Sequence, residues 1–251
     1  MAKSTYGVNV FNFKYEGNVQ LANDIIYNFA CVCYGDKYPV EYVQKLYNMV
    51  KRNTTLLVDF YVFTDHIKMQ KMLEGDIKVL PFAEHDLQGW WNKMQLFHPR
   101  TPLPGTTLYM DLDVVITENI DCFFTYKPES IFVGMNDFNP TTGGWNSSIM
   151  RFKNQKLHGK LWHKFMDDRP NLLRRFAGDQ NLISDFIKGN PGCESFPDSW
   201  TQSYKWFDRS GTRYSRQNMT YQHNGESLVT VFHGQPNPHQ SEQEWVKKAW
   251  I

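Results

Sequence analysis

The sequence predicts an α/β fold in which a mostly parallel central sheet is flanked by helices. Residues 24–39 begin as an apolar run of strand length and end in a loop that contains Gly35 and Pro39. From Pro39 onward, apolar residues recur at helical spacing, and a proline is tolerated in the first turn of a helix. Residues 56–65 are a second apolar run of strand length. Strand, helix and strand in this order begin an open parallel sheet.

The same patterns predict the remaining elements. Further strands are expected at residues 77–82, 108–111, 130–137, 146–152 and 227–234. Further helices are expected at residues 89–97, 156–168 and 179–189. Residues 189–225 lack a period and predict loops or short irregular strands. No repeat or long linker divides the chain, so we expect a single domain over residues 1–251.

Composition excludes several classes of partner. The 27 basic and 26 acidic residues nearly cancel and form no basic block, which argues against a nucleic-acid partner or an anionic membrane surface. No stretch of about 18 apolar residues is present, so we expect no integral membrane segment and a soluble, cytoplasmic protein. The four cysteines have no metal-binding spacing and predict reduced core thiols. Aromatic residues make up 16% of the chain, which suits stacking on bases or sugars but equally suits an aromatic core.

Asp111 and Asp113 are the main candidates for chemistry. Both lie in "LYMDLDVVITENID" (108–121), at the end of a run that otherwise predicts a buried strand. Buried carboxylates are costly unless they are paired or bound to a metal, and two convergent carboxylates repel each other. A divalent cation would keep both ionised. The alternative is a simple turn with one aspartate exposed, but the apolar run continues through Val114 and Ile116 and disfavours it.

Two classes of enzyme use a D-x-D motif at the end of a strand. A haloacid-dehalogenase-type phosphatase would use Asp111 and Asp113 as nucleophile and general acid, with "GDQNLISD" (178–185) as a second acidic site. That class normally opens with the motif, whereas here strands and helices precede it. It also needs a later strand that ends in Ser or Thr, and the good candidate, which ends at Thr64, comes earlier.

The second class accounts for more of the chain. Five blocks occur in order: "KMQLF" (93–97), the D-x-D, "GWNSSIMRF" (144–152), "GDQNLIS" (178–184) and "HGQPNPH" (233–239). Together they resemble glycosyltransferases of family 8, the group of glycogenin and bacterial lipopolysaccharide galactosyltransferases. The resemblance covers about residues 24–240 and implies a GT-A, Rossmann-like domain. Residues 24–121 would then bind the nucleotide, and residues 122–251 would bind acceptor and sugar and end in a metal-binding segment.

The resemblance implies a set of metal ligands. Asp111 and Asp113 would hold Mn²⁺ or Mg²⁺ against the diphosphate of a UDP-sugar, and His233 would complete the coordination. An imidazole with two carboxylates suits Mn²⁺ better than Ca²⁺. The family usually has His-x-x-Gly-x-x-Lys-Pro-Trp, whereas here Gly234 follows His233 directly. The family's phosphate-binding lysine is therefore missing from this block, and His239 lies near its place.

The resemblance also assigns the nucleotide contacts. Lys93 matches the basic residue that precedes the D-x-D and contacts the nucleotide, although a lysine at the edge of an apolar helix face also packs its stem routinely. The loop after the first strand carries Tyr34, Asp36 and Tyr38, where the family places contacts to uracil and ribose. Asp65, after the second strand, is a similar candidate. Each of these residues could equally be an ordinary turn residue.

The sugar end of the site is expected farther along the chain. Asn146 matches the asparagine that shapes the sugar and acceptor site in the family. Asp179 and Gln180 match the Asp-Gln pair that contacts the donor sugar, although Asp179 would also be a good helix N-cap. Asp137 ends a predicted strand and could face the acceptor.

The sequence therefore predicts a metal-dependent glycosyltransferase that moves a hexose from UDP-glucose or UDP-galactose to a carbohydrate or glycan hydroxyl. The resemblance implies retention of anomeric configuration. The phosphatase remains an alternative, as does a non-catalytic glycan-binding domain with the same fold. The intact D-x-D and His233 argue against the latter.

Overall fold

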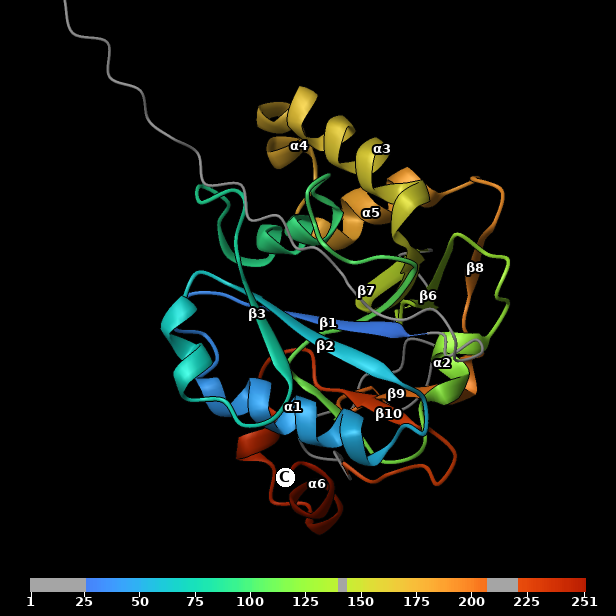
Figure 1. The fold of residues 1–251 in the computed structure, drawn as a ribbon. Coiled ribbons are helices and arrows are strands. Elements are labelled where there is room, and N and C mark those ends of the chain that lie inside the picture. The colour runs from blue at the N-terminus through green and yellow to red at the C-terminus, as the bar shows by residue number, and fades with distance from the viewer. Residues whose placement is uncertain (1–25, 140–143, 207–220) are drawn as a thin grey trace, which may run out of the picture.

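The computed structural model of the protein describes residues 26–139, 144–206 and 221–251. A seven-stranded sheet with the order β3-β2-β1-β4-β7-β6-β8 runs through its centre (Figure 1). Its strands are β1 (Tyr27–Cys33), β2 (Val58–Thr64), β3 (Ile77–Pro81), β4 (Thr106–Met110), β6 (Phe132–Asn136), β7 (Trp145–Lys153) and β8 (Cys193–Ser195). Strands from both halves of the chain join in this one sheet.

The sheet is mostly parallel, as the sequence predicts. β1 pairs in parallel with β2 and β4, β2 pairs in parallel with β3, and β6 pairs in parallel with β8. Only β7 runs against its neighbours β4 and β6. The chain moves outward from β1 to β3 and then returns to β4 on the other side of β1. The carboxyl ends of β1 and β4 therefore form a topological switch point, which is where open α/β sheets bind ligands.

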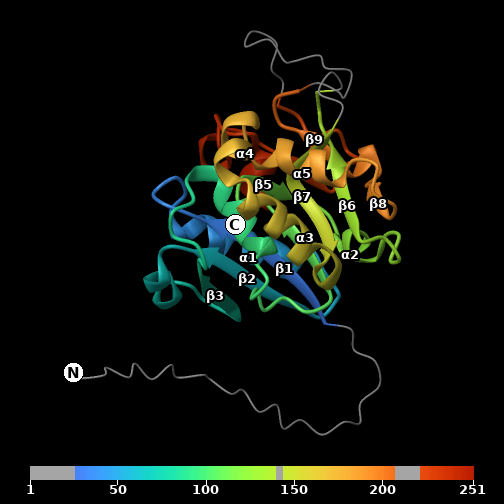
Figure 2. The same cartoon turned by 90° about the horizontal axis from the view of Figure 1, so that it is seen from above.

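Helices cover both faces of this sheet. Alternate residues of β1 point to opposite sides, so Cys31 packs in the core beneath α1 (Val40–Arg52) and Val32 packs in the core on the other side. Figure 2 shows α3 and α5 in front of the strands on that second side, and both contact β7. The helices of this side are α3 (Asn154–Asp167), α4 (Arg169–Arg175) and α5 (Asp179–Ile187).

A small second sheet carries the chain from the D-x-D to the C-terminal segment. It has the order β5-β10-β9, with β5 at Val114–Ile116, β10 at Val229–Val231 and β9 at Thr201–Ser203. β10 is antiparallel to β5 and parallel to β9. The sheet packs near α1 and α6 (Glu244–Ala249), away from α3 and α5 (Figure 1). Because β10 pairs with β5, it places His233 and Gly234 beside the D-x-D.

The segment Gly89–Phe97 differs from the sequence-based prediction. It is a 3₁₀ helix, η2, and its residues from Asn92 to Phe97 are all buried, whereas the sequence predicts a helix with a single apolar face. η2 contacts both α3 and α5, and this packing on more than one side explains the continuous burial. Lys93 is consequently buried and does not lie at a solvent border.

The remaining short elements connect these layers. They are α2 (Asp121–Thr125), η1 (Ile67–Lys71), η3 (Asp198–Trp200) and η4 (Pro238–Gln240). All four cysteines are free thiols, with Cys31 and Cys33 fully buried. In the described part of the chain, no helix is long and apolar enough to cross a membrane.

Candidate active site at the ends of β1 and β4

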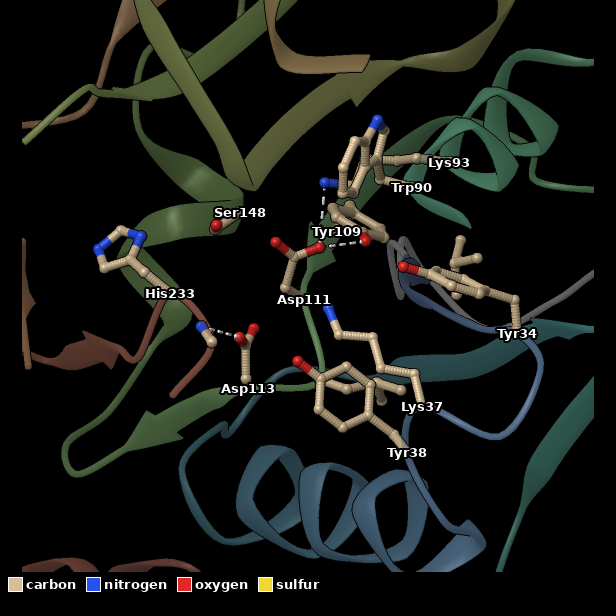
Figure 3. A pocket seen from close by; sticks show the side chains of 13 residues that line it. Tyr34, Lys37, Tyr38, Trp90, Lys93, Tyr109, Asp111, Asp113, Ser148 and His233 are labelled. Carbon is tan, nitrogen blue, oxygen red and sulfur yellow. Dashed lines mark hydrogen bonds and ion pairs between the residues drawn. The ribbon is translucent and has the colours of Figure 1, made fainter. Parts of the chain in front are cut away.

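A cavity of about 280 Å³ opens at the switch point between β1 and β4 (Figure 3). Side chains from the loop after β1, from η2, from the D-x-D turn, from β7 and from the segment after β10 meet there. The lining residues are Val32, Tyr34, Lys37, Tyr38, Trp90, Lys93, Tyr109, Asp111, Leu112, Asp113, Ser148, His233 and Gly234. The structure thus brings together six residues that the resemblance assigns to the donor and its metal: Tyr34, Tyr38, Lys93, Asp111, Asp113 and His233.

Asp111 and Asp113 lie in a turn between two sheets. β4 ends at Met110 and β5 begins at Val114 in the second sheet, so the two carboxylates converge through the turn and not along one strand. The Asp111 backbone N–H donates to the Ser148 carbonyl at 2.9 Å, and the Phe232 N–H donates to the Asp113 carbonyl at 3.0 Å. These bonds fix both ends of the turn.

Lys93 joins Asp111 to Asp179 beneath the cavity. Its ammonium lies 3.1 Å from Asp111 Oδ1 and 3.1 Å from Asp179 Oδ2. It also donates to Ser147 Oγ at 2.9 Å, and that hydroxyl donates to Asp179 Oδ2 at 2.8 Å. The Lys93 side chain is 8% exposed and the Asp179 side chain 6%. Buried charges require this degree of pairing, so the network holds its members in one geometry.

The pKa values of the two aspartates of the D-x-D are shifted in opposite directions. Burial disfavours ionisation of Asp111, but the Lys93 charge and the hydroxyl of Tyr109, 2.5 Å from Asp111 Oδ1, outweigh it and lower the pKa of Asp111. Burial and the Asp111 charge raise the pKa of Asp113, against the Gly234 N–H and the Lys37 charge. Asp113 is therefore the carboxylate that a bound cation would stabilise most.

The position of Gly234 accounts for one departure of the C-terminal block from the family pattern, the glycine that follows His233 directly. His233 and Gly234 both have positive φ, at 55° and 78°, a conformation that glycine adopts without strain. In this turn the Gly234 N–H donates to Asp113 Oδ2 at 3.1 Å, and the Lys205 ammonium donates to the His233 carbonyl at 2.8 Å. Glycine directly after the histidine is thus what brings this backbone N–H to the D-x-D.

A divalent cation fits the carboxylate pair, but the described residues do not form a complete set of metal ligands by themselves. Asp111 and Asp113 supply carboxylate oxygens to one cavity, and burial together with repulsion by Asp111 raises the pKa of Asp113, a cost of ionisation that a cation would offset. Among the described residues, however, no three His, Cys, Asp or Glu side chains are spaced to hold a metal ion. Mg²⁺ is commonly bound by one or two carboxylates with substrate phosphates and water. The arrangement suits a cation that arrives with its ligand, and His233 as a third protein ligand stays a prediction.

The loop after β1 is attached to the end of β2. The Gly35 N–H donates to both carboxylate oxygens of Asp65 at 3.1 Å, and the His66 ring nitrogen lies 3.1 Å from the Gly35 carbonyl oxygen. Asp65 therefore positions the loop and is not among the residues that line the cavity. Within the loop, Tyr34 and Tyr38 line the cavity, whereas Asp36 is exposed and does not. Burial and the Asp111 charge raise the pKa of Tyr34 to about 12.

Gln180 and Asp137 meet at a neighbouring hollow. The Gln180 side-chain nitrogen donates to Asp137 Oδ2 at 2.6 Å, and its side-chain oxygen accepts from the Ser147 N–H at 3.4 Å. Both residues line a second cavity of about 420 Å³ together with Trp145 and Arg175. Ser147 connects this pair to the Lys93 network, so the two cavities share a wall.

Two other predicted residues lie apart from the first cavity. Asn146 is buried, and its side-chain oxygen accepts from the Ser148 N–H at 2.9 Å, which shapes the strand at the cavity wall. The His239 ring contacts Tyr42 of α1, and His239 is not among the residues lining the cavity. It does not supply the missing lysine's charge there.

Several residues of the site are not among those predicted from the sequence. Lys37 and Tyr109 line the cavity, and Lys205 supports the His233 turn. Lys37 sits beside Asp36 and Tyr38 in the loop already singled out, so its charge next to two aromatic residues was an available signal. No feature of the sequence indicated a role for Lys205, because its partner is the backbone carbonyl of His233, far along the chain.

The fold is that of the GT-A glycosyltransferases, as the sequence resemblance predicts. Similar solved structures include the galactosyltransferase LgtC in complex with donor and acceptor sugar analogs, with a TM-score of 0.61, 13% identity and coverage of 89% of this chain and 91% of LgtC. The glycosyltransferase GlyE of Streptococcus pneumoniae TIGR4 has a TM-score of 0.62 and 12% identity, over 89% of this chain and 60% of GlyE. Mouse xyloside xylosyltransferase 1 has a TM-score of 0.53 and 12% identity, over 84% of this chain and 98% of its own. No protein-family model and no curated protein sequence matches the chain.

Proposed function

We propose that the protein is a metal-dependent glycosyltransferase that moves a hexose, glucose or galactose, from a UDP-sugar to a hydroxyl of a carbohydrate or glycan, with retention of configuration. The observation that carries this proposal is the Lys93 network. It joins Asp111 of the D-x-D to Asp179 of the Asp-Gln pair through contacts of 3.1 Å. The resemblance assigns the D-x-D to the diphosphate and the Asp-Gln pair to the sugar, and Lys93 holds the two motifs together at the first cavity.

The nucleotide end of the donor lies in the first cavity in this proposal. Tyr34 and Tyr38 offer aromatic faces and hydroxyls to the uracil and the ribose. Asp111 and Asp113, with His233, would hold Mn²⁺ or Mg²⁺, which would supply Lewis-acid stabilisation of the charge on the departing diphosphate. Tyr109 and Lys93 keep Asp111 ionised and in position for this contact.

The sugar end of the donor points toward Asp179 and Gln180. In a retaining transfer, the bond between the anomeric carbon and the diphosphate oxygen breaks, and a bond to the acceptor oxygen forms on the same face. The acceptor's proton passes to the departing phosphate, so no strong base is required. Gln180, oriented by Asp137 and the Ser147 N–H, steadies the positively charged sugar. The second cavity, which Gln180 lines, is the place for the acceptor.

The comparisons support this proposal at the level of the fold. LgtC was solved with donor and acceptor sugar analogs, and it shares the architecture over 89% of this chain. The position of the cavity at the switch point between β1 and β4 is independent support, since this is where an α/β sheet binds a nucleotide.

A screen of nucleotide sugars tests the proposal. The purified protein is incubated with UDP-glucose, UDP-galactose, other UDP-sugars and GDP-sugars, with MnCl₂ or with EDTA, and released nucleoside diphosphate is measured. We expect Mn²⁺-dependent release of UDP that is lost in Asp113→Ala. Binding of UDP without any release would favour the non-catalytic glycan-binding domain, and no binding of any nucleotide would refute the proposal.

The phosphatase alternative is weaker in this structure. The D-x-D follows β4, the fourth strand described, whereas the phosphatase class normally opens with its D-x-D motif. The fold is also that of glycosyltransferases. Hydrolysis of an aryl phosphate with Mg²⁺ that is lost in Asp111→Asn would revive it.

A further inference from the structure

A diphosphate in the first cavity would need a positively charged side chain beside it, and Lys93 does not provide one. Asp111 and Asp113 face the cavity, and a diphosphate would add further negative charge. Lys93 lines the cavity as well, but its ammonium already lies 3.1 Å from both Asp111 and Asp179. The charge of Lys93 is therefore used to balance the protein's own carboxylates, and little of it is left for a ligand.

Lys37 is the other lysine that lines the cavity. Its side chain extends from the loop after β1 toward Asp111 and Asp113 (Figure 3). The ammonium lies 4.7 Å from the centroid of the Tyr38 ring, within the range of a cation–π interaction. Among the described residues, no carboxylate is close enough to form an ion pair with it.

The loop that carries Lys37 is held on its other side. Gly35 has φ of 51°, and its N–H donates to both oxygens of Asp65 at 3.1 Å. These bonds attach the outer part of the loop to the end of β2, which leaves the Lys37 side chain on the side of the cavity. An ammonium that is supported by an aromatic ring and a fastened loop loses less freedom on binding an anion.

We propose that Lys37 binds the diphosphate of the donor and balances part of the negative charge on the departing UDP. This inference rests on the proposed glycosyltransferase function and names a phosphate-binding residue within it. In the sequence, the C-terminal block lacks a lysine, and in the structure His239 contacts Tyr42 outside the cavity. Lys37 supplies the missing positive charge from the loop after β1.

The test compares three ligands that differ only in phosphate. The dissociation constants of UDP, UMP and uridine are measured by titration calorimetry in MnCl₂ for the wild type, Lys37→Ala, Lys37→Met and Lys37→Arg. Lys37→Met keeps a long unbranched side chain without the charge. Lys68→Ala serves as a matched control, because Lys68 is an exposed lysine of η1 outside the cavity. Circular dichroism and a thermal melt confirm that each variant folds.

We expect Lys37→Ala and Lys37→Met to weaken UDP by about tenfold or more, the size of one charge-assisted hydrogen bond. UMP should weaken less, uridine should be unchanged, and Lys37→Arg should stay within about threefold of the wild type, since arginine also binds phosphate. Equal losses for UDP and uridine, or an unchanged UDP affinity in Lys37→Ala, would overturn the assignment while leaving the proposed function intact. A wild type that binds no UDP would overturn both.

Discussion

The ammonium of Lys93 lies 3.1 Å from Asp179 Oδ2, so η2 is fastened to the first turn of α5 inside the wall of the cavity. The same nitrogen lies 3.1 Å from Asp111 Oδ1. Burial lowers the pKa of Lys93, but the two carboxylate charges outweigh burial and raise it, which keeps the lysine charged. The arrangement fixes the distance between the D-x-D and the Asp-Gln pair before any ligand arrives.

Replacing Lys93 should destabilise the protein strongly. In Lys93→Met the stem is largely retained, but the buried Asp179 and the partly exposed Asp111 lose their counter-charge, and breaking a buried ion pair costs about 3–5 kcal/mol. The matched control is Lys78→Met, because Lys78 pairs with Asp59 at 2.5 Å with side chains 47% and 37% exposed. A surface pair of this kind contributes less than about 1 kcal/mol. Urea denaturation measures both values, and equal effects would contradict the buried network.

Asp113→Asn should stabilise the metal-free protein at neutral pH. Burial and the Asp111 charge raise the pKa of Asp113 in the folded state above its unfolded value. A raised carboxyl pKa favours folding at low pH, and this contribution is lost as the pH rises through the folded pKa. Asparagine keeps an oxygen that can accept from the Gly234 N–H but carries no charge. The gain in melting temperature over the wild type should therefore be larger at pH 7.5 than at pH 4.

The same variant separates stability from metal binding. UDP with MnCl₂ should raise the melting temperature of the wild type, since a ligand that binds only the folded state stabilises it. In Asp113→Asn this increase should be lost, although the apo variant melts higher. An increase equal to that of the wild type would exclude Asp113 as a metal ligand.

Much of the fold could be predicted from the sequence because its signals are local. The apolar run that forms β1 and the helical spacing that forms α1 each lie within one short segment, and so does the apolar run that forms β4 before Asp111. The burial of Lys93 could not be predicted in this way, because it depends on packing of η2 against α3 and α5, which are distant in sequence. A short window around residues 89–97 shows only a helix-like pattern.

The sequence motifs predicted candidate residues for the site, but they did not predict which contacts these residues make. Asp111 and Asp113 could be found because carboxylates in an apolar run are unusual, and five ordered blocks pointed to their neighbours. The part played by Asp65 could not be found, because its carboxylate binds a backbone N–H, that of Gly35, which leaves no trace in the residue types. His239 was expected near the cavity from its spacing, yet η4 directs it toward Tyr42.

Asp65→Ala should weaken donor binding without contacting the donor. Loss of the bonds between Gly35 and Asp65 frees the loop that carries Lys37, so the dissociation constant of UDP should rise by about three- to tenfold. In the Lys37→Ala background the same change should cost less, because the part of its effect that passes through Lys37 is already lost and only the part that passes through Tyr34 and Tyr38 remains. Calorimetry on the four proteins of this cycle measures the coupling. Asp76→Ala, at an exposed aspartate beyond η1, is the control, and additive losses would mean that Asp65 acts on its own.

Gln180→Ala should reduce turnover and leave nucleotide binding intact. The Gln180 side chain lies between Asp137 Oδ2 at 2.6 Å and the Ser147 N–H at 3.4 Å, beside the cavity proposed for the acceptor and away from the residues proposed for the diphosphate. We expect kcat for hexose transfer to fall by about 100-fold, as for loss of one polar contact to the transition state, while the dissociation constant of UDP changes less than about twofold. Asp137→Ala should cost less, because it only orients Gln180, and the double variant should be no slower than Gln180→Ala. If Asp137 were instead the base of an inverting transfer, Asp137→Ala would be the slower variant and the product would have inverted configuration, which NMR of the anomeric proton would show.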